Sequence, residues 1–133
     1  MSYPNALLFT SVQLSPDELL AFVEQNGGEA VEREKPSVSI IYAGDCALWI
    51  THASDELSVM QEDGYTPEIS RRLQDEPRTC VVIERTRAEG TMLLLWSFVQ
   101  AFAKQWPTVV RYERQFLSGA DLFDQDVLRN FMQ

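Results

Sequence analysis

The chain has 133 residues, of which 45% are hydrophobic and 11% aromatic, enough for one core but too few for two ordinary domains. Twenty acidic side chains against eleven basic ones give a net charge of −9 at pH 7. This charge argues against nucleic acid or an anionic membrane as the partner, because both are bound through clustered Lys and Arg. We therefore expect a single compact domain spanning residues 1–133.

The start of the chain and its two cysteines indicate the compartment. The first residues lack the basic segment, the long apolar segment and the small-residue cleavage site of a secretory signal. Cys46 and Cys80 both lie in apolar, strand-like runs, which favours two reduced, buried thiols over a disulfide. We expect a cytoplasmic protein.

The N-terminal segment predicts a strand followed by a helix. Residues 5–14 alternate well enough for a strand. Ser15 then suits the N-cap position, Pro16 the first helical position, and Glu18 completes a capping box with Ser15. The Asn-Gly-Gly sequence at 26–28 ends the helix, because these residues tolerate a left-handed backbone.

A charged edge strand and a β-hairpin are expected next. Residues 29–35 read as a short charged strand that Pro36 closes. Residues 38–43 and 46–51 are rich in β-forming residues, and the two-residue loop at 44–45 suits a hairpin. This loop sets Ile40 opposite Trp49 and puts Tyr42 on the same side. Both faces of the hairpin are apolar, so either helices cover both or this face is left for a partner.

The middle of the chain is less regular. Residues 52–64 read as a loop with one helical turn near 57–60. A helix is expected from Thr66 to a point before Pro77, because Pro67 and Glu68 suit its first turn. Residues 79–83, TCVVI, form an unbroken apolar run typical of a central strand.

The most apolar segment, residues 91–106, predicts a helix buried on more than one side. Its only polar stripe is formed by Ser97, Gln100 and Lys104, which makes a core helix more favourable than a membrane span. Pro107 ends this helix and residues 108–112 form another strand, so the segment predicts a right-handed parallel βαβ unit. A last helix after Ser118 is expected to dock on the core. The fold class expected is α+β: a mixed sheet with an antiparallel hairpin and one parallel βαβ unit, with helices packed on the sheet.

No motif in the sequence assembles a catalytic, metal or cofactor site. The only histidine, His52, lies near Asp55 and Glu56, whereas zinc sites need three or four suitably spaced ligands. Glycine-rich phosphate-binding motifs do not occur. We therefore expect no catalytic residues, no metal and no cofactor.

The distribution of carboxylates supports a binding function. Residues 1–32 carry five carboxylates and no Lys or Arg, and residues 53–77 carry seven against two arginines. We expect a non-catalytic acidic binding protein that caps a basic protein partner. The residues expected to bind the partner are Asp55, Glu56, Glu62, Asp63, Tyr42 and Trp49. The alternative is that the acidic surface only keeps the protein soluble.

In size, charge and expected architecture, the chain is similar to bacterial immunity proteins, which neutralise toxins by covering their active sites. This resemblance rests on no motif. It implies a basic toxin as the partner. A homodimer formed through the hairpin face is a further alternative.

A second function is a small enzyme or ligand-binding domain with an anion site. Arg85, Arg87 and Thr91 lie between the central strand and the apolar helix, and Arg111 is expected on the neighbouring strand. A helix N-terminus with converging arginines attracts phosphate or carboxylate groups. Glu84 or Glu89 would supply the acid or base. With twenty acidic residues in the chain, pairing of these arginines with carboxylates of the protein's own surface is favoured over the anion site.

Overall fold

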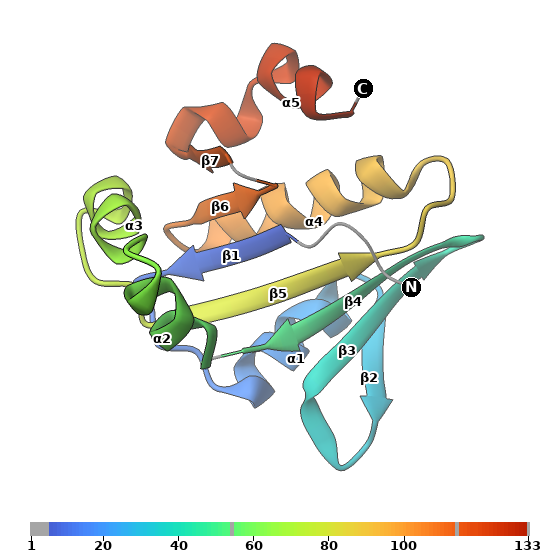
Figure 1. Ribbon diagram of the computed structural model, residues 1–133. Helices are drawn as coiled ribbons and strands as arrows, with labels where there is room; N and C mark the ends of the chain where they lie inside the picture. The colour runs from blue at the N-terminus through green and yellow to red at the C-terminus, as the bar shows by residue number, and fades with distance from the viewer. Residues whose placement is uncertain (1–5, 54, 114, 133) are drawn as a thin grey trace.

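The computed structural model describes residues 6–53, 55–113 and 115–132, and leaves the side chains of residues 55, 56, 59, 60, 131 and 132 undescribed. The described residues form one seven-stranded sheet with the order β2-β3-β4-β5-β1-β6-β7 and helices on both faces (Figure 1). The strands are β1 (Ala6–Thr10), β2 (Gly28–Glu32), β3 (Lys35–Ala43), β4 (Cys46–His52), β5 (Thr79–Arg85), β6 (Val109–Tyr112) and β7 (Gln115–Ser118). The helices are α1 (Pro16–Gln25), α2 (Asp55–Glu62), α3 (Thr66–Leu73), α4 (Thr91–Gln105) and α5 (Gln125–Met132), with a 3₁₀ turn η1 (Gly119–Phe123). Within this description, every helix falls short of the length and apolar character needed to cross a bilayer.

The α+β class is confirmed, but the expected parallel βαβ unit is wrong. Strand β1 lies between β5 and β6 and is antiparallel to each, so every neighbouring pair in the described sheet is antiparallel. Leu7 of β1 lies opposite Val82 on one side and Arg111 on the other. Leu8 and Phe9 point to opposite faces and are both fully buried, which suits β1 to an interior position.

The β3–β4 hairpin has the register expected from its loop. Ile40 pairs with Trp49 and Tyr42 with Ala47 across the antiparallel ladder. The turn uses Gly44 at φ +62°, a left-handed conformation that glycine adopts without steric cost. Tyr42 and Trp49 therefore point to the same side of the sheet.

The first face of the sheet carries the main core, formed against α1 and α4. Phe98 and Phe102 of α4 are buried there, and Phe22 of α1 packs edge-on against Phe98 at 5.6 Å between ring centres. On its outer side, α4 contacts η1, where Gln100 donates a hydrogen bond to the Leu122 carbonyl. The apolar segment is thus buried on more than one side, because the sheet, α1 and η1 each cover part of it.

Several boundaries differ from expectation. β1 ends at Thr10, short of the predicted end at residue 14, and α2 occupies residues predicted mainly as loop. The charged segment at 29–35 is divided between β2 and β3, so Pro36 lies within β3 instead of closing a strand. The register places Pro36 outside the pairs of β3 with its neighbours, so its missing N–H costs no ladder bond there. The helix expected from Ser118 is divided into the 3₁₀ turn η1 and α5, and strand β7, which was not predicted, comes before them.

Among the described elements, two helices cover one end of the second face. Figure 1 shows α2 and α3 together over that end of the sheet. The small cluster beneath them includes Phe9, Ile69, Cys80 and Val109, all fully buried. Farther along this face, toward the β3–β4 turn, lies the candidate site.

Candidate functional site

The candidate site is the part of the second face formed by β3, β4 and β5. Directly opposite residues in an antiparallel pair point to the same side of the sheet. The register therefore groups eight side chains on this face: Val38, Ile40 and Tyr42 from β3, Ala47, Trp49 and Thr51 from β4, and Val82 and Glu84 from β5. We call these eight residues the open face. It is largely apolar and carries one carboxylate, that of Glu84.

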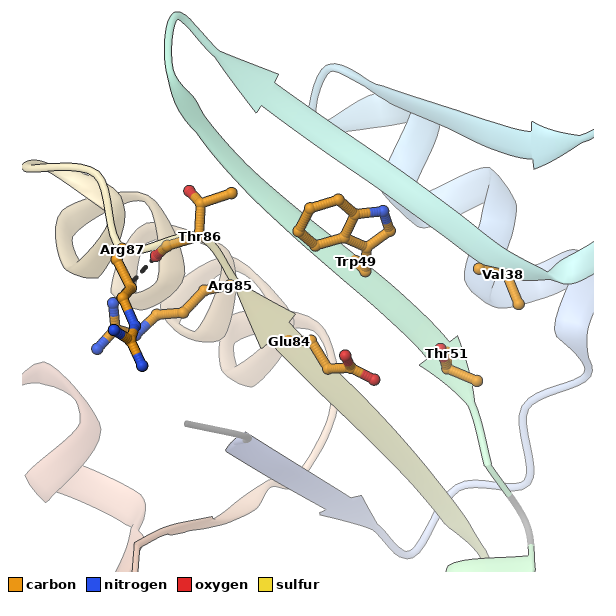
Figure 2. Close-up of a pocket in the computed structure, with 7 residues that line it drawn as sticks. All are labelled: Val38, Trp49, Thr51, Glu84, Arg85, Thr86 and Arg87. Carbon is orange, nitrogen blue, oxygen red and sulfur yellow. Dashed lines mark hydrogen bonds between the residues drawn. The ribbon is translucent and has the colours of Figure 1, made fainter. Parts of the chain in front are cut away.

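A hollow of about 630 Å³ lies over the open face (Figure 2). Its lining residues are Val38, Trp49, Thr51, Glu84, Arg85, Thr86 and Arg87. This volume lies within the range of roughly 300–1,000 Å³ found for ligand pockets, but the hollow is open to solvent instead of enclosed. It therefore suits a group presented on the surface of another molecule.

Trp49 and Glu84 form the centre of the hollow. They are direct cross-strand neighbours on β4 and β5, and both are partly buried. Figure 2 shows the indole ring and the carboxylate on the same side of the sheet, with the Glu84 side chain extending toward Thr51. An aromatic ring and a carboxylate on neighbouring positions of one face can both attract a cation.

The two arginines of the hollow are directed elsewhere. Figure 2 shows both side chains running from the end of β5 away from the indole ring of Trp49. Arg85 donates one hydrogen bond to the Thr86 carbonyl at 3.1 Å and another to the Tyr112 hydroxyl at 3.4 Å. Arg87 is exposed on the loop after β5. Glu84 is consequently the charged lining residue whose side chain shares the side of the indole ring.

The four residues of the expected anion site are not all brought together. The buried Thr91 hydroxyl donates to the Ala88 carbonyl at 2.7 Å and lies 3.2 Å from the Thr86 hydroxyl, so it holds the start of α4. Arg111 lies across the sheet, with its guanidinium group 4.2 Å from the centre of the Tyr65 ring. Arg85 and Thr91 remain near the end of β5, whereas Arg111 packs beside α3.

The expected partner-binding residues lie on two elements. Tyr42 and Trp49 share the open face, and Tyr42 is 58% exposed. Glu62 and Asp63 are exposed at the end of α2 and in the turn that follows. The side chains of Asp55 and Glu56 lie outside the described residues. Since α2 starts soon after β4 ends, Glu62 is about 10 Å farther along the helix from that strand.

Sequence reasoning did not identify Val38, Thr51 or the pairing of Glu84 with Trp49 as parts of one site. The hairpin register already put Val38 and Thr51 on the face of Tyr42 and Trp49. No local pattern, however, joins Trp49 to Glu84, because α2 and α3 separate β4 from β5 in the chain.

His52 and the cysteines take part in packing. Nε2 of His52 lies 2.6 Å from the Leu14 carbonyl oxygen, a geometry in which the ring nitrogen donates the hydrogen bond. Cys46 is buried and donates from its thiol to the Glu89 carbonyl, and Cys80 is buried beneath α3. Across the part of the chain that the structure describes, no three His, Cys, Asp or Glu side chains are grouped to hold a metal ion.

Comparison with known proteins identifies no relative: no family model matches the sequence, no curated protein matches it, and no solved structure matches the fold.

Proposed function

We propose that this chain is a non-catalytic binding protein that uses its open face to cap a protein partner with a basic surface. The observation that carries the proposal is the largely apolar face of β3, β4 and β5, which the described helices on that side, α2 and α3, leave uncovered. Tyr42 is 58% exposed there, and Trp49 is only partly buried. Aromatic side chains are enriched at the centres of protein interfaces, where one apolar side is buried and a polar group remains available.

Charge supports a basic partner. Glu29 lies opposite Ile40 at the β2 edge of the face, Asp45 is exposed in the turn beyond Tyr42, and Glu84 lies within the hollow. These carboxylates add to a net charge of −9. A positively charged surface would be attracted before contact and oriented on docking. A basic bacterial toxin is one partner of this chemistry, and the chain would then act as an immunity protein in the cytoplasm.

The first experiment identifies the partner and tests the face. The tagged chain serves as bait in a lysate of the source organism, and the captured protein is identified, produced and purified. Binding kinetics are then measured for the purified pair. We expect Tyr42→Ser to raise the dissociation rate about tenfold or more, because interface aromatics are frequent hot spots. Glu29→Lys reverses a carboxylate at the β2 edge of the open face and should slow association. Glu24→Lys, an exposed change on α1 at the opposite face, is its control.

The second experiment tests the electrostatic part. The association rate should fall as ionic strength rises, and reversing Asp55, Glu56, Glu62 and Asp63 to lysine should slow it sharply. An association rate indifferent to salt and to these reversals would reject the basic partner. If Tyr42→Ser leaves the dissociation rate of the partner unchanged, the proposal that the open face binds the partner is wrong. Sedimentation of the chain alone tests the homodimer, which Tyr42→Ser should also dissociate.

A second candidate function, an anion site at Arg85 and Arg87, has one observation in its favour. The Nε atom of Arg85 is buried and has no hydrogen-bond acceptor among the described residues. A bound phosphate or carboxylate would supply one. Melting temperatures measured across a panel of such anions test this site. A rise that Arg85→Gln abolishes would support it, and no rise with any anion would reject it.

A further inference from the structure

We infer that the hollow beside Trp49 and Glu84 receives an arginine side chain of the protein partner. This inference rests on the proposed function and adds the chemistry of the central contact. Trp49 and Glu84 are opposite each other on adjacent antiparallel strands, which puts their Cβ atoms about 5 Å apart. In the proposed complex, a guanidinium group lies between the indole ring and the carboxylate.

The part of the lining formed by Val38, Trp49, Thr51 and Glu84 suits arginine, and the side chains of Arg85 and Arg87 point away from it. The planar guanidinium group stacks on an aromatic face and forms paired hydrogen bonds with a carboxylate, which a lysine ammonium group does not. Val38 offers apolar surface to the methylene stem, and the Thr51 hydroxyl can accept a further N–H bond. A carboxylate has about four acceptor positions, so Glu84 can receive the guanidinium in addition to bonds it makes within the protein.

The surroundings favour a side chain from a protein over a free small cation. The hollow is open to solvent, and the register puts Tyr42, which is 58% exposed, on the same face of the sheet. A partner that inserts one arginine into the hollow would therefore be able to bury the Tyr42 ring at the same time. Arginines in such positions, surrounded by groups that exclude water, are recurrent hot spots of interfaces.

The test uses a peptide with one arginine, acetyl-Gly-Ala-Arg-Ala-Gly-amide, and the same peptide with citrulline, its neutral counterpart. Binding is followed by NMR on the indole N–H signal of Trp49, assigned with Trp49→Phe. We expect the arginine peptide to shift this signal saturably while the Trp96 and Trp106 signals stay in place. The citrulline peptide should bind about tenfold more weakly, because the charged hydrogen bonds are lost.

Variants test the carboxylate and the ring. Glu84→Gln should weaken binding of the arginine peptide about tenfold. Trp49→Leu should weaken it about threefold. Because this variant lacks the Trp49 signal, its binding is measured from the NMR signals of other open-face residues. Glu24→Gln removes the same charge from the far side of the molecule and should leave binding unchanged. Unchanged melting temperatures establish that the variants fold. The comparison of the two peptides uses the unchanged protein, so it remains valid even if a protein variant misfolds.

Three results would overturn the inference. They are absence of binding by the arginine peptide, equal binding of the two peptides, and an effect of guanidinium chloride equal to that of the arginine peptide at the same concentration. The last would identify a site for free cations. These results leave the proposed function to be judged separately, since the effect of Tyr42→Ser on the purified partner does not depend on the arginine.

Discussion

Leu14 and Thr79, 65 residues apart in the chain, are joined by a buried hydrogen bond of 2.8 Å from the Leu14 amide to the Thr79 hydroxyl. The same hydroxyl donates to the Val12 carbonyl at 2.8 Å. Nε2 of His52 lies 2.6 Å from the Leu14 carbonyl oxygen on the other side. The segment between β1 and α1 leaves the sheet after Thr10, and these side chains replace the partners that the sheet would have provided.

Replacing Thr79 by valine should therefore destabilise the protein. The substitution keeps a similar shape but leaves the Leu14 amide and the Val12 carbonyl without this partner. We expect the free energy of unfolding to fall by about 2 kcal/mol, measured by urea denaturation. Thr51→Val, a matched change in the hollow, should alter it by less than about 0.5 kcal/mol. Equal effects of the two substitutions would contradict the role given to Thr79.

Gly28 should be intolerant of a side chain. A Cβ atom there would lie 2.7 Å from the Ile40 carbonyl oxygen and would also meet Cγ1 of Val23 and of Ile41. Gly28→Ala would have to push β2 away from β3 and α1, and we expect a loss of about 2 kcal/mol in thermal or urea unfolding.

Gly44→Ala provides the comparison for Gly28. Gly44 has φ +62° but open space around the added atom. Gly44→Ala should therefore lower the free energy of unfolding only by the cost of holding alanine in a left-handed conformation, about 1 kcal/mol. A smaller loss for Gly28→Ala than for Gly44→Ala would show that β2 can move without cost.

Two apolar residues of α4 should differ strongly in their contribution to stability. Phe102 is fully buried between the sheet and α1, whereas Leu93 is 62% exposed. Phe102→Ala should lower the free energy of unfolding by about 3–5 kcal/mol, because it leaves a cavity in the main core. Leu93→Ala should change it by no more than about 0.5 kcal/mol. Chemical denaturation of both variants checks the difference, which similar losses would refute.

The carboxyl group of Glu68 should have a pKa below its ordinary value. Hydrogen bonds from Arg72 first, and then from Arg71, lower the pKa of Glu68 below its ordinary value of 4.5. Because the folded-state pKa is depressed, the stabilisation is present above pH 4.5 and is lost as the pH falls through the lowered pKa.

NMR titration of the Glu68 carboxyl carbon measures this pKa directly. Arg72→Gln should return the pKa toward 4.5 more than Arg71→Gln, since Arg72 is the larger cause and is less exposed than Arg71. A larger return in Arg71→Gln would reverse the ranking of the two arginines.

Some elements were predictable because their signals are local. The capping box of α1 is formed as expected: the Ser15 hydroxyl accepts from the Glu18 amide at 3.1 Å, and the Glu18 carboxylate accepts from the Ser15 amide at 3.0 Å. Both partners lie within one helical turn. The register of the β3–β4 hairpin was likewise contained in its two-residue loop, and the apolar pattern of α4 indicated its burial.

Other features had no local signal. Main-chain hydrogen bonds are alike for any strand partner, so the sequence around β5 and β6 did not reveal that β1 inserts between them. For α2, the helical pattern was too weak to outweigh its polar residues. In the candidate site, the hairpin loop indicated that Trp49 and Tyr42 share a face, whereas only the pairing of β4 with β5 places Glu84 opposite Trp49.

The sequence by itself determined the acidic character of this protein, the helix that its core requires and the hairpin that carries Tyr42 and Trp49. Only the tertiary structure decided which strands are neighbours, which end of the second face α2 and α3 cover, and which carboxylate lies beside the indole ring. The physical reason is range. Caps, turns and periodicity act within a few residues, whereas sheet order follows from the burial of apolar faces by segments distant in the chain.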